Sequence, residues 1–376
     1  MDFSLSEDQL ALADLATRIF ADLATPQRAR QAEAGDGVDW ELWSALASAQ
    51  LLGLPVPEEH GGAGLGMVET CLLLEQQGRR VAAVPLWPTL AVVAPALAEL
   101  ASPGLQARWL PPLCRGEVVL SAALSEPGAN DVLDTQVRAV ADGGSWRLEG
   151  DKPCVPYASC SAAVLVPARG PEGIGLFMLD PASPGVSRQD ADTTGREPQS
   201  HLGLDGAQVP GEDVVCAPSP EGRGALARVV VHAWVALAAL QVGVAEEALA
   251  MAAAYTSERR QFGRPLATNQ AVAMRAADCY IDVEAMRATM WQAAWRISAG
   301  LDAFAEALVA KWWAAEAGQR VVHAVQHLHG GLGADVEYPV HRYFLWGKHI
   351  ETALGGGSWQ LARLGAHLTA GAGRPA

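Results

Sequence analysis

The sequence predicts an α+β protein with an N-terminal helical domain, a middle antiparallel β-domain and a C-terminal helical bundle. Apolar residues recur at helical spacing in the first and last parts of the chain. In the middle part, short alternating runs are separated by Gly, Pro and Asp, as in a sheet with one buried face. These changes of pattern predict domains at residues 1–115, 116–222 and 223–376.

The N-terminal region opens with the pair Ser6 and Gln9, which is the spacing of a capping box and predicts that a helix begins here. This helix is expected to bury Leu12, Leu15 and Ile19, because these side chains share one face.

A second helix is expected to end at Gly53, since large apolar side chains precede it at helical spacing: Trp40, Trp43, Leu46 and Leu51. The stretch LPVPEEHGGAGLG then predicts a loop that leads into a helix at Met67–Gln77. GGAGLG is expected to be a turn, because no strand precedes it as a nucleotide-binding loop requires.

Strands are expected at the alternating runs of the middle region: Val118–Leu124, Thr135–Val140, Trp146–Glu149, Ala162–Pro167 and Gly175–Leu179. Helices of the last region are expected at roughly 223–260, 268–299, 302–329 and 338–354, with a final one from 358. The tryptophans of this region are expected to pack in a core or an interface rather than to line a cofactor site.

The composition excludes several classes of protein. Hydrophobic residues make up 50% of the chain and charged residues 18%, so a compact globular protein is expected. The formal net charge of −15 argues against a nucleic-acid partner and against a polybasic membrane-surface protein. We expect no signal peptide in MDFSLSEDQL and find no uninterrupted apolar run of transmembrane length. The 6 cysteines are scattered without a C-x-x-C pair, which favours free thiols and a cytoplasmic location.

A series of motifs resembles those of the acyl-CoA dehydrogenase family, in the family's order and over nearly the whole chain. They are MDFSLSEDQ, SEPGAND, WRLEGDK, ERRQFGRPL and HLHGGLG, the last followed by EYP and HRY. The resemblance implies an FAD-dependent enzyme that α,β-dehydrogenates an acyl-CoA thioester. In that reaction a carboxylate removes the α-proton and the flavin accepts the β-hydrogen as hydride.

The resemblance also implies that this chain contributes to a flavin seated in a neighbouring subunit. Arg259 stands where the family has an arginine on the FAD pyrophosphate, and Gln261 and Phe262 match the positions that follow. Gly330 and Gly331 would let the backbone approach the cofactor closely.

His327 stands where the family usually has Gln, and it can still donate a hydrogen bond. His323, His327 and His329 are candidate metal ligands by residue type, but the spacing supplies no carboxylate ligand and no H-E-x-x-H pattern. We therefore expect no metal and prefer packing and cofactor contact for these histidines.

The half of the cofactor site in the chain's own β-domain departs from the family. Two positions match it: Leu124 and Ser125. Asp131 replaces the phosphate-facing serine and Asn130 replaces the preceding glycine, so a carboxylate would oppose the pyrophosphate. Cys154 and Pro156 stand where the family often has an aromatic residue and Thr or Ser against the flavin ring. This half of the cofactor site is therefore expected to keep only part of the family's contacts with FAD.

The usual catalytic base is also missing from its position. The family's commonest base is the Glu of an E-G-T-S stretch, which here reads G-G-G-S and places Gly355, or Gly356 after a slip of one residue, on the Glu position. The family's alternative base position falls on Ala233. Two nearby side chains are candidate substitute bases: Glu351, one turn before Gly355, and His232, beside Ala233. A polar helix face is the simpler explanation for Glu351. No catalytic residue is therefore expected in this chain.

Three local sequences resemble those of the base-less sister chains found in actinobacterial enzymes of steroid side-chain breakdown: HLHGGLG, EYPVHRYFLW and LGGGS. Those sister chains assemble as α2β2 with a catalytic chain. We therefore expect a non-catalytic subunit of a heteromeric acyl-CoA dehydrogenase. The alternatives are a self-sufficient homomeric flavoenzyme with an atypical base or different flavin chemistry, and a purely structural or regulatory protein that binds no flavin.

Overall fold

The computed structural model describes residues 4–128 and 131–372. The chain divides into two compact units. One unit contains residues 4–29, 71–82 and 234–372, and the other contains 30–70, 83–128 and 131–233. The predicted fold class is confirmed: helices come first along the chain, then a sheet, then long helices.

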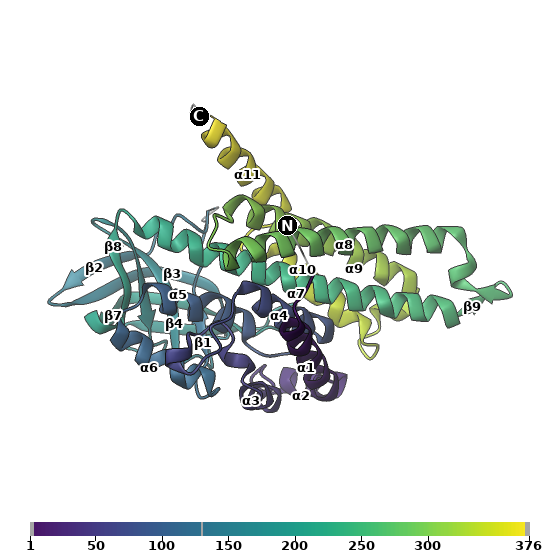
Figure 1. The fold of residues 1–376 in the computed structure, drawn as a ribbon, viewed down its shortest axis with the longest axis horizontal. Helices are drawn as coiled ribbons and strands as arrows, with labels where there is room; N and C mark the ends of the chain where they lie inside the picture. Colours follow the sequence, from purple (N-terminus) through teal and green to yellow (C-terminus); the bar gives the residue numbers. More distant parts are fainter. Residues whose placement is uncertain (1–3, 129–130, 373–376) are drawn as a thin grey trace. The chain divides into compact units, whose positions relative to one another are not determined.

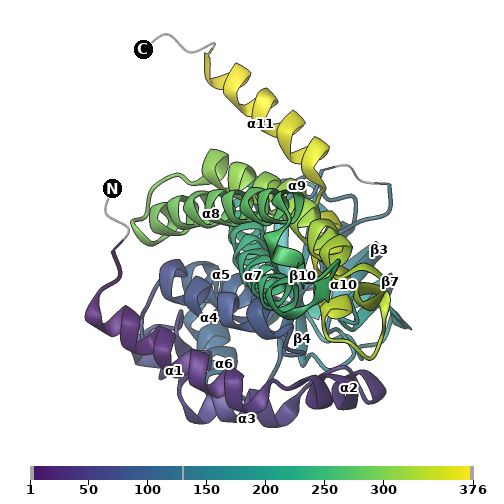
Figure 2. The same ribbon diagram turned by 90° about the vertical axis from the view of Figure 1, so that its right-hand side faces the viewer.

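The first unit is a bundle of helices. It contains α1 (Glu7–Leu23), most of α4 (Met67–Arg80), the part of α7 (Gly222–Glu258) from Trp234 onward, α8 (Gln270–Ser298), α9 (Phe304–His329), α10 (Val340–Thr352) and α11 (Gly357–Ala372). Helices α8 and α9 run side by side (Figure 1), and α9 also packs against α10 and α11. Figure 2 shows that α11 extends away from α8 and α9.

The start of α1 confirms the predicted capping box. The Ser6 hydroxyl accepts the Gln9 N–H at 3.2 Å, and the Gln9 side chain accepts the Ser6 N–H at 3.0 Å. The predicted buried face of α1 was wrong. The buried residues are Ala16 and Phe20, so the buried face is rotated slightly about the helix axis from the predicted one. The predicted side chains, Leu12, Leu15 and Ile19, are only half-buried and flank that line of contact.

Helices α4 and α7 pack backbone to backbone because glycines face each other. A Cβ on Gly78 would lie 2.1 Å from the Leu240 carbonyl oxygen, and one on Gly243 would lie 2.1 Å from the Glu75 carbonyl oxygen. Such distances leave no room for any side chain at either position. The close approach brings charged side chains of α4 and α7 within reach of α8.

The second unit contains the remaining N-terminal helices: α2 (Pro26–Ala34), α3 (Trp40–Ser48), the π-helical stretch η3 (Trp87–Val93), α5 (Ala94–Leu100) and α6 (Pro103–Cys114). The predicted single helix that ends at Gly53 is instead α3 followed by the short 3-10 helix η1 (Leu51–Gly53). The break has a backbone cause, since Gln50 takes a left-handed conformation with φ 60°. GGAGLG forms the expected turn before α4, with positive φ at Gly61 and Gly64.

An 8-stranded sheet makes up the rest of this unit, with the order β6-β7-β3-β2-β4-β5-β8 and with β1 paired to β4. The strands are β1 (Leu120–Ala122), β2 (Arg138–Asp142), β3 (Ser145–Pro156), β4 (Ala163–Gly170), β5 (Gly173–Leu179), β6 (Val186–Ala191), β7 (Gln199–Pro210) and β8 (Val214–Ser219). Most pairs are antiparallel as predicted, whereas β1 and β2 each pair with β4 in parallel. Alternate side chains such as Leu148, Val164, Phe177 and Leu202 form its core.

Helix α7 is long and apolar enough to cross a membrane by length and composition alone. However, 83% of its most apolar window is buried within the protein, which is typical of the core helix of a globular fold.

Candidate functional site

The ERRQFGRPL motif forms a small hairpin directly after α7. Strand β9 (Arg260–Gln261) pairs antiparallel with β10 (Arg264–Pro265). Phe262 and Gly263 make the turn with φ values of 53° and 80°, the backbone that favours Asn-Gly. The Phe262 side chain is 95% exposed, so it contributes little to the packing of its own chain. A bulky, almost fully exposed residue in strained backbone indicates a role toward another molecule.

Arg259 differs from the other arginines of this segment. Arg260 donates to the Gly263 carbonyl oxygen at 3.2 Å, and Arg264 donates to the Asn269 side chain at 2.7 Å. Within residues 4–128 and 131–372, the exposed Arg259 guanidinium has no partner. Its five N–H donors are therefore available to an anionic ligand.

The HLHGGLG motif lies close to this hairpin. His329 is the last residue of α9, and its ring stacks on Tyr255 at 4.8 Å, one helical turn before Arg259. The His329 Nδ1 lies 2.9 Å from the Val325 carbonyl oxygen and donates to it, because a carbonyl only accepts. Burial lowers the pKa of His329, so the imidazole is neutral. The structure thus brings two of the predicted cofactor-binding motifs together.

The next residues leave the backbone accessible. His327 is exposed on the last turn of α9. Gly330 has φ 62°, and a Cβ on Gly330 or Gly331 would have no neighbour within 4 Å. No crowding within the described chain requires glycine at Gly331, so the open space there can admit a ligand or a partner. His323 instead packs edge-on against Phe344 at 4.9 Å.

The SEPGAND loop of the β-domain is held by an ion pair that the sequence did not reveal. Leu124 is buried and Ser125 half-buried after β1. The next residue, Glu126, accepts from the Lys152 ammonium at 2.5 Å, and both side chains are almost completely buried. Burial alone would raise the pKa of Glu126, but the attraction of Lys152 and the hydrogen bonds from Lys152, Thr135 and Gln136 together hold the pKa below its ordinary value. Burial lowers the pKa of Lys152 to about 8.

The departures from the family in this loop have local partners. One carboxylate oxygen of Asp131 accepts the Leu133 N–H at 2.8 Å, and the other lies 3.9 Å from the Arg223 guanidinium. Asn130 lies outside the described residues. Cys154 is exposed in a β3 irregularity with φ 55°, and Pro156 is buried with its carbonyl oxygen accepting from the Ser121 hydroxyl.

The triple-glycine corner between α10 and α11 is closely tied by side chains. The fully buried Lys311 ammonium donates to three carbonyl oxygens: those of Ile350 at 3.0 Å, Glu351 at 3.2 Å and Gly355 at 3.0 Å. Burial lowers the pKa of Lys311 to about 7, and the charge of Glu351 opposes that shift. Because the last carbonyls of a helix lack intrahelical partners, Lys311 acts as a side-chain cap for α10.

The corner itself has a left-handed backbone. Leu354 has φ 53° and Gly355 has φ 102°. The Leu354 carbonyl oxygen accepts from Trp234 Nε1 and from Gln360 Nε2, each at 3.0 Å. Gly355 therefore stands in a fixed conformation that favours glycine.

The two nearby side chains weighed as substitute bases are both engaged. His232 Nδ1 lies 3.2 Å from the Ala91 carbonyl oxygen, and burial lowers the pKa of this histidine. Glu351 forms an ion pair with Lys348, three residues earlier on α10. Ala233, at the alternative base position, is completely buried.

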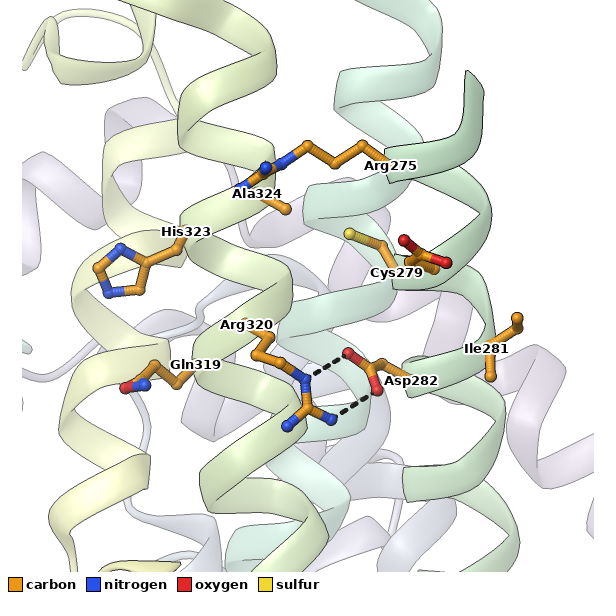
Figure 3. Close-up of a pocket in the computed structure, with 9 residues that line it drawn as sticks. Arg275, Cys279, Ile281, Asp282, Gln319, Arg320, His323 and Ala324 are labelled. Atoms are coloured by element: carbon orange, nitrogen blue, oxygen red, sulfur yellow. Dashed lines mark hydrogen bonds and ion pairs between the residues drawn. The ribbon is translucent and has the colours of Figure 1, made fainter. Parts of the chain in front are cut away.

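A groove between α8 and α9 carries none of the sequence motifs. Its volume is about 640 Å³, and Arg275, Cys279 and Asp282 of α8 point toward α9, where Arg320 lies opposite them (Figure 3). His323 also lines the groove, but its ring points away from α8. Arg320 binds the Asp282 carboxylate through two hydrogen bonds of 3.0 and 2.7 Å. Burial raises the pKa of the Cys279 thiol to about 11, so this cysteine is not a reactive thiolate.

Comparison with known proteins gives concordant results. The chain matches the model of the acyl-CoA dehydrogenase N-terminal domain over residues 6–117 and that of the C-terminal domain over residues 221–369. It is 37% identical to the acyl-CoA dehydrogenase FadE27 of Mycobacterium tuberculosis, over 98% of this chain and 99% of that protein.

Two solved structures are similar throughout. A variant of the Tcur3481-Tcur3483 steroid ACAD is 48% identical with a TM-score of 0.93, over 99% of this chain and 100% of that chain. The ChsE4-ChsE5 complex from Mycobacterium tuberculosis is 38% identical with a TM-score of 0.92, over 100% of both chains. With the motifs in the predicted order and this agreement over the full length, the chain belongs to the acyl-CoA dehydrogenase family.

Proposed function

We propose that this chain is the non-catalytic subunit of a heteromeric, FAD-dependent acyl-CoA dehydrogenase. FAD is the cofactor of the family, and when bound it accepts the hydride from the acyl chain. The observation that carries the proposal is Gly355, a glycine with φ 102° at the position that the family resemblance gives to the base. Losing a general base costs roughly 10²–10⁴ in rate, so the chain alone is expected to be a poor dehydrogenase.

The residues present fit one part of an FAD site better than the other. Arg259 offers a guanidinium that has no partner among the residues that the structure describes, and Gly330 and Gly331 offer open backbone on the segment that packs beside this hairpin. Toward the β-domain, the Asp131 carboxylate opposes a pyrophosphate, and Pro156 offers neither hydroxyl nor N–H. This asymmetry supports a subunit that helps to hold a flavin seated mainly in another chain.

The proposed partner is a catalytic sister chain in an assembly of two chains of each kind. Support comes from the ChsE4-ChsE5 structure, which is a complex, and from the steroid ACAD, whose name pairs Tcur3481 with Tcur3483. The same relative makes steroid side-chain CoA esters the proposed substrate class. A cytoplasmic location is proposed because all 6 cysteines are free thiols.

The experiment measures FAD content and FAD dissociation in the complex of this chain with a co-expressed catalytic chain. We expect about one FAD per pair of unlike chains. Arg259→Ala should weaken flavin binding about tenfold to hundredfold, because a charge-assisted phosphate contact is lost. Arg264→Ala is the matched control, since its guanidinium already binds Asn269. One FAD per chain, or unchanged flavin retention by Arg259→Ala, would refute the proposal.

A second experiment addresses the alternative of a self-sufficient enzyme. The isolated chain should turn over short, long and steroid-bearing acyl-CoA thioesters at a negligible rate. Robust turnover that Glu351→Gln abolishes would instead identify Glu351 as an atypical base.

A further inference from the structure

The space beside Gly355 is filled by an aromatic ring of the same chain. A Cβ built on Gly355 would lie 2.6 Å from Trp359 Cε3, and 3.1 Å from both Trp359 Cδ2 and Gln360 Nε2, so the indole makes the closest contact. Carbon atoms that are not bonded to each other prefer separations of about 3.5–4.0 Å. A side chain at Gly355 and the present position of the Trp359 indole are therefore mutually exclusive.

The indole is held on more than one side, so it cannot move aside freely. Trp359 contacts the ring of Trp234 edge-on at 6.1 Å, and the Arg363 guanidinium lies 5.1 Å above the Trp359 ring. Trp234 is completely buried and is itself fixed by its hydrogen bond to the Leu354 carbonyl oxygen. Rings in such contact stabilise each other beyond the burial of their surface.

The adjacent glycine has a different environment. A Cβ on Gly356 would meet only the Glu351 carbonyl oxygen, at 3.9 Å, and Gly356 has no positive φ. The chain thus carries a matched pair of neighbouring glycines, one blocked by Trp359 and one with room for a side chain.

We propose that Trp359 occupies the space into which a base at position 355 would project, so that Trp359 and Gly355 together determine that this subunit has no base. The assignment of position 355 to the base rests on the proposed function. The blocking of position 355 by the ring does not rest on it. Restoring a carboxylate therefore requires two changes, one at Gly355 and one at Trp359.

A double-mutant cycle on the purified full chain tests the contact. Gly355→Ala should lower the folding equilibrium constant about tenfold or more, because both positive φ and the clash oppose it. Gly356→Ala should change it less than about threefold, since this half-buried position has room for a methyl group and an unstrained backbone. In the Trp359→Ala background, Gly355→Ala should be at least about fivefold less damaging than in the wild type. Equal damage in both backgrounds would overturn the proposal.

The functional arm measures exchange of the α-protons of hexanoyl-CoA with deuterium by NMR, a readout of base placement that does not require turnover. Gly355→Glu/Trp359→Ala should exchange these protons faster than Gly355→Ala/Trp359→Ala, whereas Gly355→Glu alone should not. Exchange by Gly355→Glu alone at the rate of the double variant would contradict the proposal, as would no exchange by the double variant above its control. FAD stoichiometry of the complex tests the proposed function separately.

Discussion

The ammonium nitrogen of Lys311 lies 3.0 Å from the carbonyl oxygen of Gly355, and the same group donates to the last carbonyls of α10. A single buried cation thus connects the end of one helix to the glycine corner that follows it. Lys311 lies on α9, so a side chain of α9 helps to fix the conformation of this corner, in addition to the glycines themselves.

Lys311→Met should destabilise the chain by about 2–3 kcal/mol, because buried carbonyl oxygens lose a charged donor. Urea denaturation of the purified chain measures this difference in the free energy of unfolding. Lys348→Met is the control, since Lys348 lies on α10, its side chain is one-third exposed, and it pairs with the side chains of Glu351 and Gln319 rather than with the carbonyl oxygens of the corner. Its effect should stay below about 1 kcal/mol. Equal losses in the two variants would contradict the capping role of Lys311.

Glu75 predicts a pH dependence of stability. It lies in a buried network in which Arg287 contacts both Glu75 at 2.5 Å and Glu246 at 2.6 Å. Burial raises the pKa of Glu75 from 4.5 to about 7, against the attraction of Arg287. At a pH between 4.5 and about 7, the folded chain keeps a proton on Glu75 that the unfolded chain releases. The stabilisation that results is complete below pH 4.5, and it is lost as the pH rises through about 7.

Glu75→Gln should remove this dependence. Relative to the wild type, the variant should gain up to about 3 kcal/mol in the free energy of unfolding between about pH 5 and pH 8. Denaturation curves of both proteins across that range provide the measurement. Glu247→Gln is the control, because it removes a carboxylate of α7 that lies outside this network, 3.7 Å from Arg80. A constant difference between Glu75→Gln and the wild type would show that Glu75 does not titrate in this range.

The buried pair of Glu126 and Lys152 is expected to stabilise the chain through its charges. Glu126→Gln should destabilise the chain by about 3–5 kcal/mol, because it leaves the Lys152 ammonium buried without a counter-charge. Glu126→Leu/Lys152→Met removes both charges and should be less destabilised than the single variant. Thermal or urea denaturation distinguishes the two. If the double variant loses as much as the sum of both single variants, the pair contributes through packing rather than charge.

Much of the fold could be predicted because its elements have strong periodic patterns. The long helices of the bundle begin and end within a few residues of their predicted bounds, as for α8 at Gln270–Ser298. Strands β6, β7 and β8 were not predicted. In β6 all but the first residue are exposed, so no alternation marks it as a strand. Helix α2 was missed for a related reason, since a single residue of it, Ala32, is buried.

Residues of the candidate site could be predicted only where they belong to a recognisable sequence motif. Arg259 and Gly330 stand in recognisable motifs, and the structure brings their segments together through Tyr255 and His329. The contacts of Glu126 with Lys152 and of Gly355 with Trp359 depend on backbone geometry. No spacing rule in the sequence encodes the left-handed turn at Leu354 and Gly355 that aims position 355 at the indole.

Phe262 carries the last prediction, in which stability and binding change in opposite directions. This side chain is 95% exposed and its residue has φ 53° in a tight hairpin turn followed by Gly263. Phe262→Asn provides the Asn-Gly pair that this turn favours, so the isolated chain should gain about 0.5–1 kcal/mol in the free energy of unfolding. The same change should speed flavin loss from the complex with the catalytic chain, because the aromatic surface offered to the partner site is removed. Phe262→Leu keeps an apolar side chain and the strained backbone, so it should show neither the gain in stability nor the faster flavin loss. Urea denaturation of the isolated chain and flavin release from the complex are the two measurements. A loss of stability in Phe262→Asn would mean that Phe262 packs within its own chain, and unchanged flavin release would remove it from the cofactor-binding residues.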